Sequence, residues 1–256
     1  MMQLVDVHCH LESRHFAGKL DTIIEKAKSV GLVALITCAI VPDEWELSQS
    51  ISKNYKEVYF ALGVHPWYIA ESYHNELYRL TRIHDDKYCA IGEIGLDAKT
   101  TIDMKLQKKF FEDQVAIANE LGKPIIVHCR GAFNELIASL KRVGALKAGG
   151  VIHSYSGNLE IAKALIPYGF YFSFGGAITF RNSKKKLQVL QHIYPDYVLL
   201  ETDSPDIPPV EKSGEINVPE NIIYVIKAIS ELIGKPEEEI ASTTTNNAKT
   251  LFKLKL

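Results

Sequence analysis

The sequence contains histidines and carboxylates that each stand where a short apolar run stops. Glu93 lies in one such run, over residues 91–97, between Gly92 and Gly95. The other members of the set are His8, His10, His128, His153 and Asp203. Imidazole nitrogens and carboxylate oxygens together form a normal site for Zn²⁺, Mn²⁺ or a similar cation. The set therefore predicts a metal-dependent hydrolase.

The order of these residues suggests two cations that share Glu93. His8 and His10 are two residues apart, so both imidazoles project to the same side of an extended segment. With Asp203 and Glu93 they would hold a first cation. A second cation would be held by His128 and His153, with Glu93 spanning both. Shared carboxylates bring cations to about 3.5–4 Å, where a water is activated and developing oxyanions are stabilised.

Catalytic roles are predicted for the two carboxylates, with Asp203 as a ligand that also takes the proton of the attacking water. Two other side chains are predicted to contact the substrate. His65 follows the third apolar run, and we expect substrate contact rather than metal ligation. Arg130 could hold a phosphate through two hydrogen bonds, and a salt bridge to Glu135 or Glu201 is the alternative.

Two acidic residues are interpreted as supporting groups. Asp6 precedes His8 by one strand pitch, so it could support the ligands or bind a buried backbone group. Glu201 is expected to face away from Thr202 and to be structural or to support a ligand.

The elements that must position these residues alternate along the chain. Eight apolar runs, continuous as in strands buried on both faces, alternate with longer amphipathic stretches, and no linker divides residues 1–256. We therefore expect one domain, and a (β/α)8 barrel rather than a doubly wound sheet, because nothing marks a reversal of strand order. The predicted strands are residues 4–8, 32–37, 58–63, 89–93, 124–128, 150–153, 170–174 and 198–202. The predicted helices are residues 19–30, 43–54, 75–83, 102–121, 134–142, 159–166, 183–193 and 219–233, with a ninth over 243–252 to close the bottom or side.

A barrel of this kind carries its function at the C-terminal ends of the strands. The six predicted ligands follow the first, fourth, fifth, sixth and eighth predicted strands. They would therefore meet on one rim.

Composition limits the classes of partner. The chain has 256 residues, is 46% hydrophobic and carries a net charge of −2, so it lacks the overall positive field of proteins that bind nucleic acid by neutralising phosphates. The lysines at 105, 108, 109 and 184–186 could bind nucleic acid locally, although a solvated helix face is the favoured interpretation.

No apolar run approaches the roughly 18 residues of a membrane helix, and the N-terminus enters a strand directly. We expect a cytosolic protein without a membrane partner, and we interpret Cys9, Cys38, Cys89 and Cys129 as small buried side chains.

These motifs resemble those of the TatD family of metal-dependent deoxyribonucleases, over essentially the whole chain. The matching segments are residues 6–11, 63–66, 91–97, 127–130, 153–157, 200–205 and 247–252. The resemblance implies the same six ligands, hydrolysis of phosphodiesters, typically in DNA, and a requirement for divalent metal.

Four positions depart from the family pattern. Glu12 stands where the family usually has Asp, Ala98 where an aromatic residue is common, and Gly131 where an acidic residue is frequent. Residues 216–219 read Ile-Asn-Val-Pro in place of Arg-Asn-Glu-Pro. These changes leave the predicted ligands intact and affect the choice of substrate.

The favoured function is an exonuclease with two divalent ions, Zn²⁺, Mn²⁺ or Mg²⁺, that acts on single-stranded or frayed DNA ends, because a barrel mouth admits a strand terminus more easily than a duplex. The alternatives are an amide, ester or lactone hydrolase, or a deacylase of aminoacyl-tRNA. Related barrels often bridge their metals with a carbamylated lysine, so Glu93 favours the nuclease, whereas the missing arginine favours the alternatives. A barrel that only binds is the third interpretation, and the oligomeric state is open.

Overall fold

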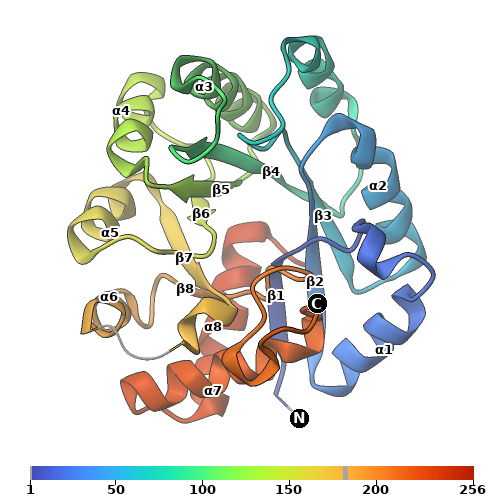
Figure 1. Ribbon diagram of the computed structural model, residues 1–256, viewed down its shortest axis with the longest axis vertical. Coiled ribbons are helices and arrows are strands. Elements are labelled where there is room, and N and C mark those ends of the chain that lie inside the picture. The colour runs from blue at the N-terminus through green and yellow to red at the C-terminus, as the bar shows by residue number, and fades with distance from the viewer. Residues whose placement is uncertain (1, 181–183) are drawn as a thin grey trace.

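The computed structural model describes residues 2–180 and 184–256, and its helices surround a ring of strands (Figure 1). Eight parallel strands pair in chain order from first to last. Two hydrogen bonds join the residues that follow the last strand to the end of the first: Asp203 N–H donates to the His8 carbonyl (2.9 Å) and His10 N–H to the Ser204 carbonyl (2.8 Å). The predicted (β/α)8 barrel is confirmed. The strands are β1 (Leu4–Cys9), β2 (Leu32–Ala39), β3 (Val58–Leu62), β4 (Tyr88–Asp97), β5 (Ile125–Arg130), β6 (Gly150–Ile152), β7 (Phe170–Phe174) and β8 (Val198–Leu200).

The helices follow the predicted order, with ends that differ by a few residues. They are α1 (Leu20–Ser29), α2 (Trp45–Asn54), α3 (Met104–Leu121), α4 (Phe133–Val143), α5 (Leu159–Leu165), α6 (Lys184–Ile193), α7 (Ile222–Ile233) and α8 (Glu237–Phe252). Short 3₁₀ helices join them: η1 (Arg14–Phe16), η2 (Pro42–Glu44), η4 (Ile166–Tyr168), η5 (Gly176–Ile178), η6 (Val210–Lys212) and η7 (Pro219–Asn221). Residue 183, the predicted start of the helix that ends at Ile193, lies outside the described residues.

The α-helix predicted over residues 75–83 was wrong. The chain forms a 3₁₀ segment there, η3 (Glu71–Arg82). Its buried apolar side chains, Leu77 and Leu80, are three residues apart. In a 3₁₀ helix, residues i and i+3 eclipse one another, so this spacing places both on the face toward the core.

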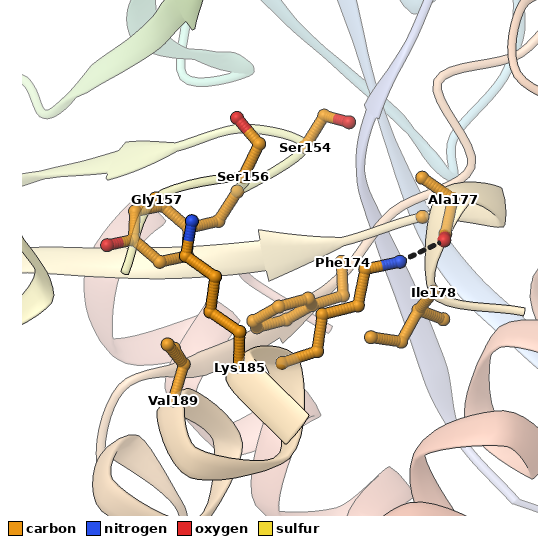
Figure 2. Close-up of a pocket in the computed structure, with 11 residues that line it drawn as sticks. Ser154, Ser156, Gly157, Phe174, Ala177, Ile178, Lys185 and Val189 are labelled. Carbon is orange, nitrogen blue, oxygen red and sulfur yellow. Dashed lines mark hydrogen bonds between the residues drawn. The ribbon is translucent and has the colours of Figure 1, made fainter. Parts of the chain in front are cut away.

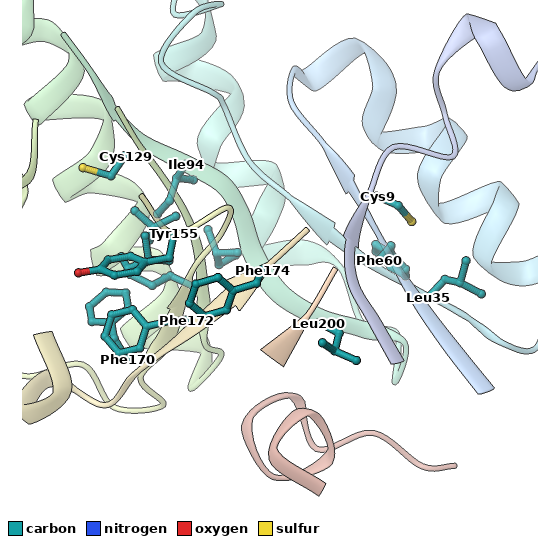
Figure 3. Packing of buried hydrophobic residues seen from close by; sticks show 14 of the residues in the cluster. Cys9, Leu35, Phe60, Ile94, Cys129, Tyr155, Phe170, Phe172, Phe174 and Leu200 are labelled. Atoms are coloured by element: carbon teal, nitrogen blue, oxygen red, sulfur yellow. The ribbon is translucent and has the colours of Figure 1, made fainter. Parts of the chain in front are cut away.

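The core has two layers. The outer layer packs strand side chains against the helices, and Figure 3 shows Tyr155 in it beside Phe172, with ring centroids 4.7 Å apart. The inner layer fills the barrel with side chains such as Val7, Ile126 and Phe252. Each fully buried aliphatic or aromatic side chain stabilises the fold by roughly 1.5–3 kcal/mol.

Helix α8 closes the N-terminal end of the barrel, opposite the rim that carries the predicted ligands. Its Thr245 hydroxyl donates to the carbonyl of Gln3, just before β1 (2.8 Å), and its last turn adds Leu251 and Phe252 to the inner layer. The ninth predicted helix therefore exists and covers the bottom rather than the side.

Two other expectations concern buried cysteines and membrane helices. All four cysteines are free and buried, as predicted. Among the described residues, no helix has the length and apolar character needed to cross a membrane.

Candidate metal centre

The six predicted ligands meet at the C-terminal end of the barrel. Three groups of ligand atoms each lie within 4.8 Å of one another. The groups are His8 with Glu93 and His153, His8 with His10 and Asp203, and His65 with Glu93 and His128. The structure thus brings together the side chains expected to hold metal, and it adds His65 to them.

A break in the strand alternation of β4 turns Glu93 into this cluster. Ile91 and Ile94 both belong to the outer core layer, and the register of β4 against β5 shifts between them. Strict alternation would place Glu93 on the same face as Ile91. The extra residue within the shift lets Glu93 face the barrel interior.

Two glycines permit this path of β4. A Cβ atom on Gly92 would lie 2.6 Å from the Cβ of Ile126 in β5. Gly95 has φ +144° and passes so close to β5 that a Cβ there would lie 1.9 Å from the carbonyl oxygen of His128. No side chain fits at either position, so both glycines are needed to position Glu93 and His128.

The two oxygens of Glu93 face different sets of imidazoles. Oε2 lies 3.4 Å from His8 Nε2 and 3.8 Å from His10 Nε2. Oε1 lies 2.9 Å from His153 Nε2 and 3.3 Å from His128 Nδ1. This division is the one that a carboxylate bridging two cations requires.

Asp203 completes the side of the cluster that contains the two N-terminal histidines. Its Oδ1 lies 3.4 Å from His8 Nε2 and 3.5 Å from His10 Nε2. Its backbone has φ +59°, a conformation that Asp and Asn adopt more readily than most residues. Burial works to raise the pKa of Asp203, but the neighbouring imidazoles of His10 and His8 lower it below its usual value, so the carboxyl is ionised.

Burial and the neighbouring imidazoles also have opposite effects on the pKa of Glu93. Burial works to raise its pKa, but the imidazoles of His153, His65 and His8 hold it well below the usual range. The centre therefore offers two ionised carboxylates in a buried pocket of histidines, which is an environment suited to cations.

Unpaired buried nitrogens show that the donor set fits a divalent metal. Both ring nitrogens of His8, and Nδ1 of His153, are buried and have no hydrogen-bond partner among the described residues. A buried polar atom left without a partner costs about 1–3 kcal/mol. A cation bound at His8 Nε2 would satisfy one of them, with carboxylate oxygens from Glu93 and Asp203 close by.

A buried carboxylate and a carbonyl orient His10. Its Nδ1 donates to the carbonyl of Cys38 (2.8 Å) and lies 3.3 Å from Glu12 Oε1. Glu12 is itself held by the hydroxyls of Thr37 and Ser48. With its proton fixed on Nδ1, His10 presents Nε2 as a lone pair toward Asp203.

Asp97 orients His128 as Glu12 orients His10. Its Oδ2 lies 2.9 Å from His128 Nε2, which leaves Nδ1 to face Glu93, and it also accepts from the indole N–H of Trp67 (2.5 Å). Sequence reasoning gave Asp97 no role. Strand alternation was the available signal, because residues 93, 95 and 97 of a strand share one face.

Glu201 and Asp6 act as supporting groups. Glu201 accepts from Ser154 N–H (2.7 Å) and from the Ser173 hydroxyl (2.5 Å), and it lies 3.7 Å from His153 Nδ1. Asp6 accepts from the backbone N–H (2.9 Å) and hydroxyl (2.6 Å) of Thr202, which joins β1 to the residues after β8. Burial raises the pKa of Asp6 to about 7.

His65 and Arg130, the predicted substrate contacts, differ in exposure. His65 is only 5% exposed, with Nε2 3.3 Å from Glu93 Oε1 and Nδ1 accepting from Trp67 N–H (3.1 Å). His65 therefore has little exposed surface for a substrate, and it lies where a metal-ligating side chain would lie.

Arg130 is exposed, and among the described residues it forms no ion pair with Glu135 or Glu201, so the alternative salt bridge is not formed. Contact between Arg130 and a phosphate stays a prediction.

Comparisons with known proteins agree with this geometry. Residues 5–253 match the family model described as TatD related DNase. The uncharacterized metal-dependent hydrolase YabD of Bacillus subtilis (strain 168) is 35% identical over 253 residues, which are 98% of this chain and 99% of the relative. The crystal structure of YjjV, a TatD homolog from Escherichia coli K12, superposes with a TM-score of 0.92 at 30% identity and 98% coverage of both chains. A TatD family hydrolase from Entamoeba histolytica has the same fold, with a TM-score of 0.87 at 21% identity and 98% coverage of both chains.

Proposed function

The chain belongs to the TatD family of metal-dependent hydrolases, and from this premise we propose that it is a nuclease that removes nucleotides from single-stranded ends of DNA. The observation that carries the proposal is the division of Glu93, whose two oxygens face separate sets of imidazoles. Two cations about 3.5–4 Å apart suit the in-line displacement of a phosphodiester, because both the attacking and the leaving oxygen carry charge.

Each cation would have its own set of residues. His8, His10 and Asp203 would hold the first with Oε2 of Glu93, and His128 and His153 would hold the second with Oε1. When bound, the metals supply Lewis acidity that lowers the pKa of water and neutralises charge on phosphate oxygens. His65 would add a nitrogen to the second set, in place of the substrate contact expected from the sequence.

Asp203 is the proposed proton acceptor. It enters the reaction ionised, because His8 and His10 lower its pKa. Its Oδ1 lies 3.4 Å from His8 Nε2 and 3.5 Å from His10 Nε2, and Asp203 is 7% exposed. Glu93 is 3% exposed and is fixed by several imidazoles, which suits a bridging ligand better than a proton carrier.

Exposed aromatic side chains on the rim are an argument for a single-stranded substrate. Trp67 is 46% exposed although its indole N–H is tied to the buried Asp97, and its ring lies 6.0 Å from that of His128. Phe180 is also exposed on this rim. Unpaired bases stack on such rings, with about 1–3 kcal/mol per base, whereas paired bases cannot reach them. Arg130 would contact a phosphate beside them.

The test is release of label from single-stranded DNA that carries a fluorophore at its 3′ or 5′ end. Metal-stripped protein receives Mn²⁺, Mg²⁺ or Zn²⁺, and we expect release that depends on the metal. Asp203→Asn should lower the rate by about 10²–10⁴-fold, the usual contribution of a positioned proton acceptor. Asn keeps the acid's shape and tolerates the positive φ of this position, so the variant should keep its melting temperature.

Release from blunt duplex DNA tests whether the proposed nuclease prefers single-stranded ends. We expect slower release from the duplex than from the single strand, and equal rates on both would contradict action on single-stranded ends. The second candidate is hydrolysis of an ester, a lactone or an aminoacyl-tRNA. Ile216 favours it, because this side chain is 51% exposed where the family usually has an arginine that could contact phosphate. Turnover of those substrates by metal-loaded protein that leaves DNA intact would establish the second candidate.

A further inference from the structure

A cavity of about 180 Å³ lies beside the metal centre, between the loop after β6, the end of β7 with η5, and α6. Figure 2 shows its side chains. Pockets that hold whole drug-sized molecules measure about 300–1,000 Å³. This cavity therefore matches one ring system rather than a long stretch of strand.

Apolar side chains form the floor of the cavity. Phe174 and Ile178 are each 4% exposed, and Val189 is 1% exposed. Tyr155 adds a second aromatic ring. A flat apolar group is the kind of ligand that such a floor binds.

Cations and hydroxyls surround this floor. Lys186 reaches across it to donate from Nζ to the Ala177 carbonyl (2.5 Å), and burial lowers its pKa. Figure 2 shows Lys185 extended toward Ser156 and Gly157. Lys185 is exposed and has no acidic partner within 4 Å in the part of the chain that the structure describes. No acidic residue lines the cavity among the described residues, so its rim favours an anion.

The cavity shares a wall with the metal centre. Ser154, which lines it, directly follows the predicted ligand His153, and its N–H donates to Glu201 Oε1 (2.7 Å). Gly175 also lines it, and a Cβ there would lie 3.2 Å from Glu201 Cγ. Glu201 thus stands between the cavity and His153. A molecule in the cavity is therefore a near neighbour of one in the metal centre.

We infer that this cavity binds one nucleotide unit next to the bond that is cleaved, with the base on Phe174 and Ile178 and a phosphate at Lys185. The inference rests on the proposed function, because it assigns a further part of the same substrate strand. It also changes one interpretation made from the sequence, since two lysines of the run at 184–186 line a cavity instead of only covering a solvated helix face.

The test uses metal-free protein in EDTA, so that phosphate cannot be held by the metal centre and no turnover is needed. Saturation-transfer NMR measures the dissociation constant of thymidine 5′-monophosphate, with thymidine and inorganic phosphate as separate probes. We expect the nucleotide to bind more tightly than either part, with the base protons most strongly saturated. Lys185→Ala should weaken nucleotide binding about fivefold, the upper range for one exposed charge, while Lys185→Arg should retain it.

Two further variants complete the design. Ser156→Phe places a ring at the exposed edge of the cavity and should weaken binding at least about fivefold by displacing the base. Lys163→Ala removes another exposed charge, from α5 and outside the cavity, and should leave the dissociation constant unchanged. Nucleotide binding that is unaffected by both Lys185→Ala and Ser156→Phe, or no binding at all, would overturn the inference.

The nucleotide-binding test and the nuclease assay can fail independently of one another. If DNA is not cleaved but the nucleotide binds and the cavity variants weaken it, the proposed function fails and the binding site stands. If DNA is cleaved and the metal-free protein binds no nucleotide, the site is wrong and the function stands.

Discussion

The histidines of the candidate metal centre are oriented by hydrogen-bond partners that lie behind them, on the side away from Glu93 and Asp203. His10 is oriented by Glu12 and the carbonyl of Cys38, and His128 by Asp97. Glu12 stands where the family usually has the shorter Asp, yet it reaches both His10 and Thr37. Glu12 is therefore long enough to orient His10 in this protein.

Asp97→Asn tests this positioning. The amide can no longer act as an ionised acceptor for both His128 Nε2 and the Trp67 indole, so His128 should lose its fixed tautomer. We expect the affinity for the more weakly held metal to fall about 10–100-fold, as found for partners of ligating histidines. Competition with a metal indicator measures it.

The control for Asp97→Asn is Asp196→Asn, the same change at an exposed position outside the cluster, which should leave the affinity unaltered. Trp67→Phe is the complementary variant, because it removes the indole N–H and keeps a ring on the rim. Equal affinity in Asp97→Asn and the unaltered protein would show that His128 needs no such partner.

At the scale of the elements, the close approach of β4 and β5 determines the site. The two strands pair from Ile91 to Asp97 with one register shift, and the glycines of β4 allow contact that any side chain would prevent. Hydrogen bonds of a buried ladder resist displacement, because separated backbone groups would lose their partners.

Gly95→Ala should accordingly be severely destabilising. Its Cβ would lie 1.9 Å from the His128 carbonyl oxygen at φ +144°, and relief requires moving β5 with its ligand. We expect a loss of at least about 4 kcal/mol in the free energy of unfolding, measured with urea. Gly122→Ala, at φ +62° with open space around it, should cost only about 1–2 kcal/mol. Similar losses for both variants would contradict the steric explanation.

At the scale of the whole molecule, the two ends of the barrel have separate tasks. The C-terminal end carries the predicted metal ligands and the cavity, while α8 closes the other end with Leu251 and Phe252. A net charge of −2 gives no general attraction for nucleic acid, so the proposed DNA substrate would have to be bound by local groups at the mouth of the barrel.

Phe252→Ala tests the separation of these tasks. The side chain is 3% exposed within the inner core, so its loss should destabilise the fold by about 3–5 kcal/mol. Because the metal centre lies at the opposite end, the folded variant should bind metal at full stoichiometry, measured by elemental analysis below its melting temperature. Leu47→Ala, at a 47% exposed position of α2, should change stability little. Loss of metal from the folded Phe252→Ala protein would show that the two ends are coupled.

The sequence by itself determined the barrel, the order of its elements and the histidines and carboxylates that gather at its strand ends. These depend on local patterns, since apolar runs specify buried strands and parallel strands place all their C-terminal ends on one rim. It also indicated the orientation of His8 and His10, whose rings lie 4.9 Å apart. A period of two residues is enough to put both on one side.

Only the tertiary structure decided the features that depend on register and close approach. The shift in β4 turned Glu93 inward, Asp97 at the end of β4 met His128 of β5, and His65 was buried beside Glu93 and His128. The cavity at Lys185 and Lys186 is likewise formed by the loop after β6, the end of β7 and α6. Such contacts join residues far apart in the chain, and one residue of register changes which face a side chain occupies, so no local pattern contains them.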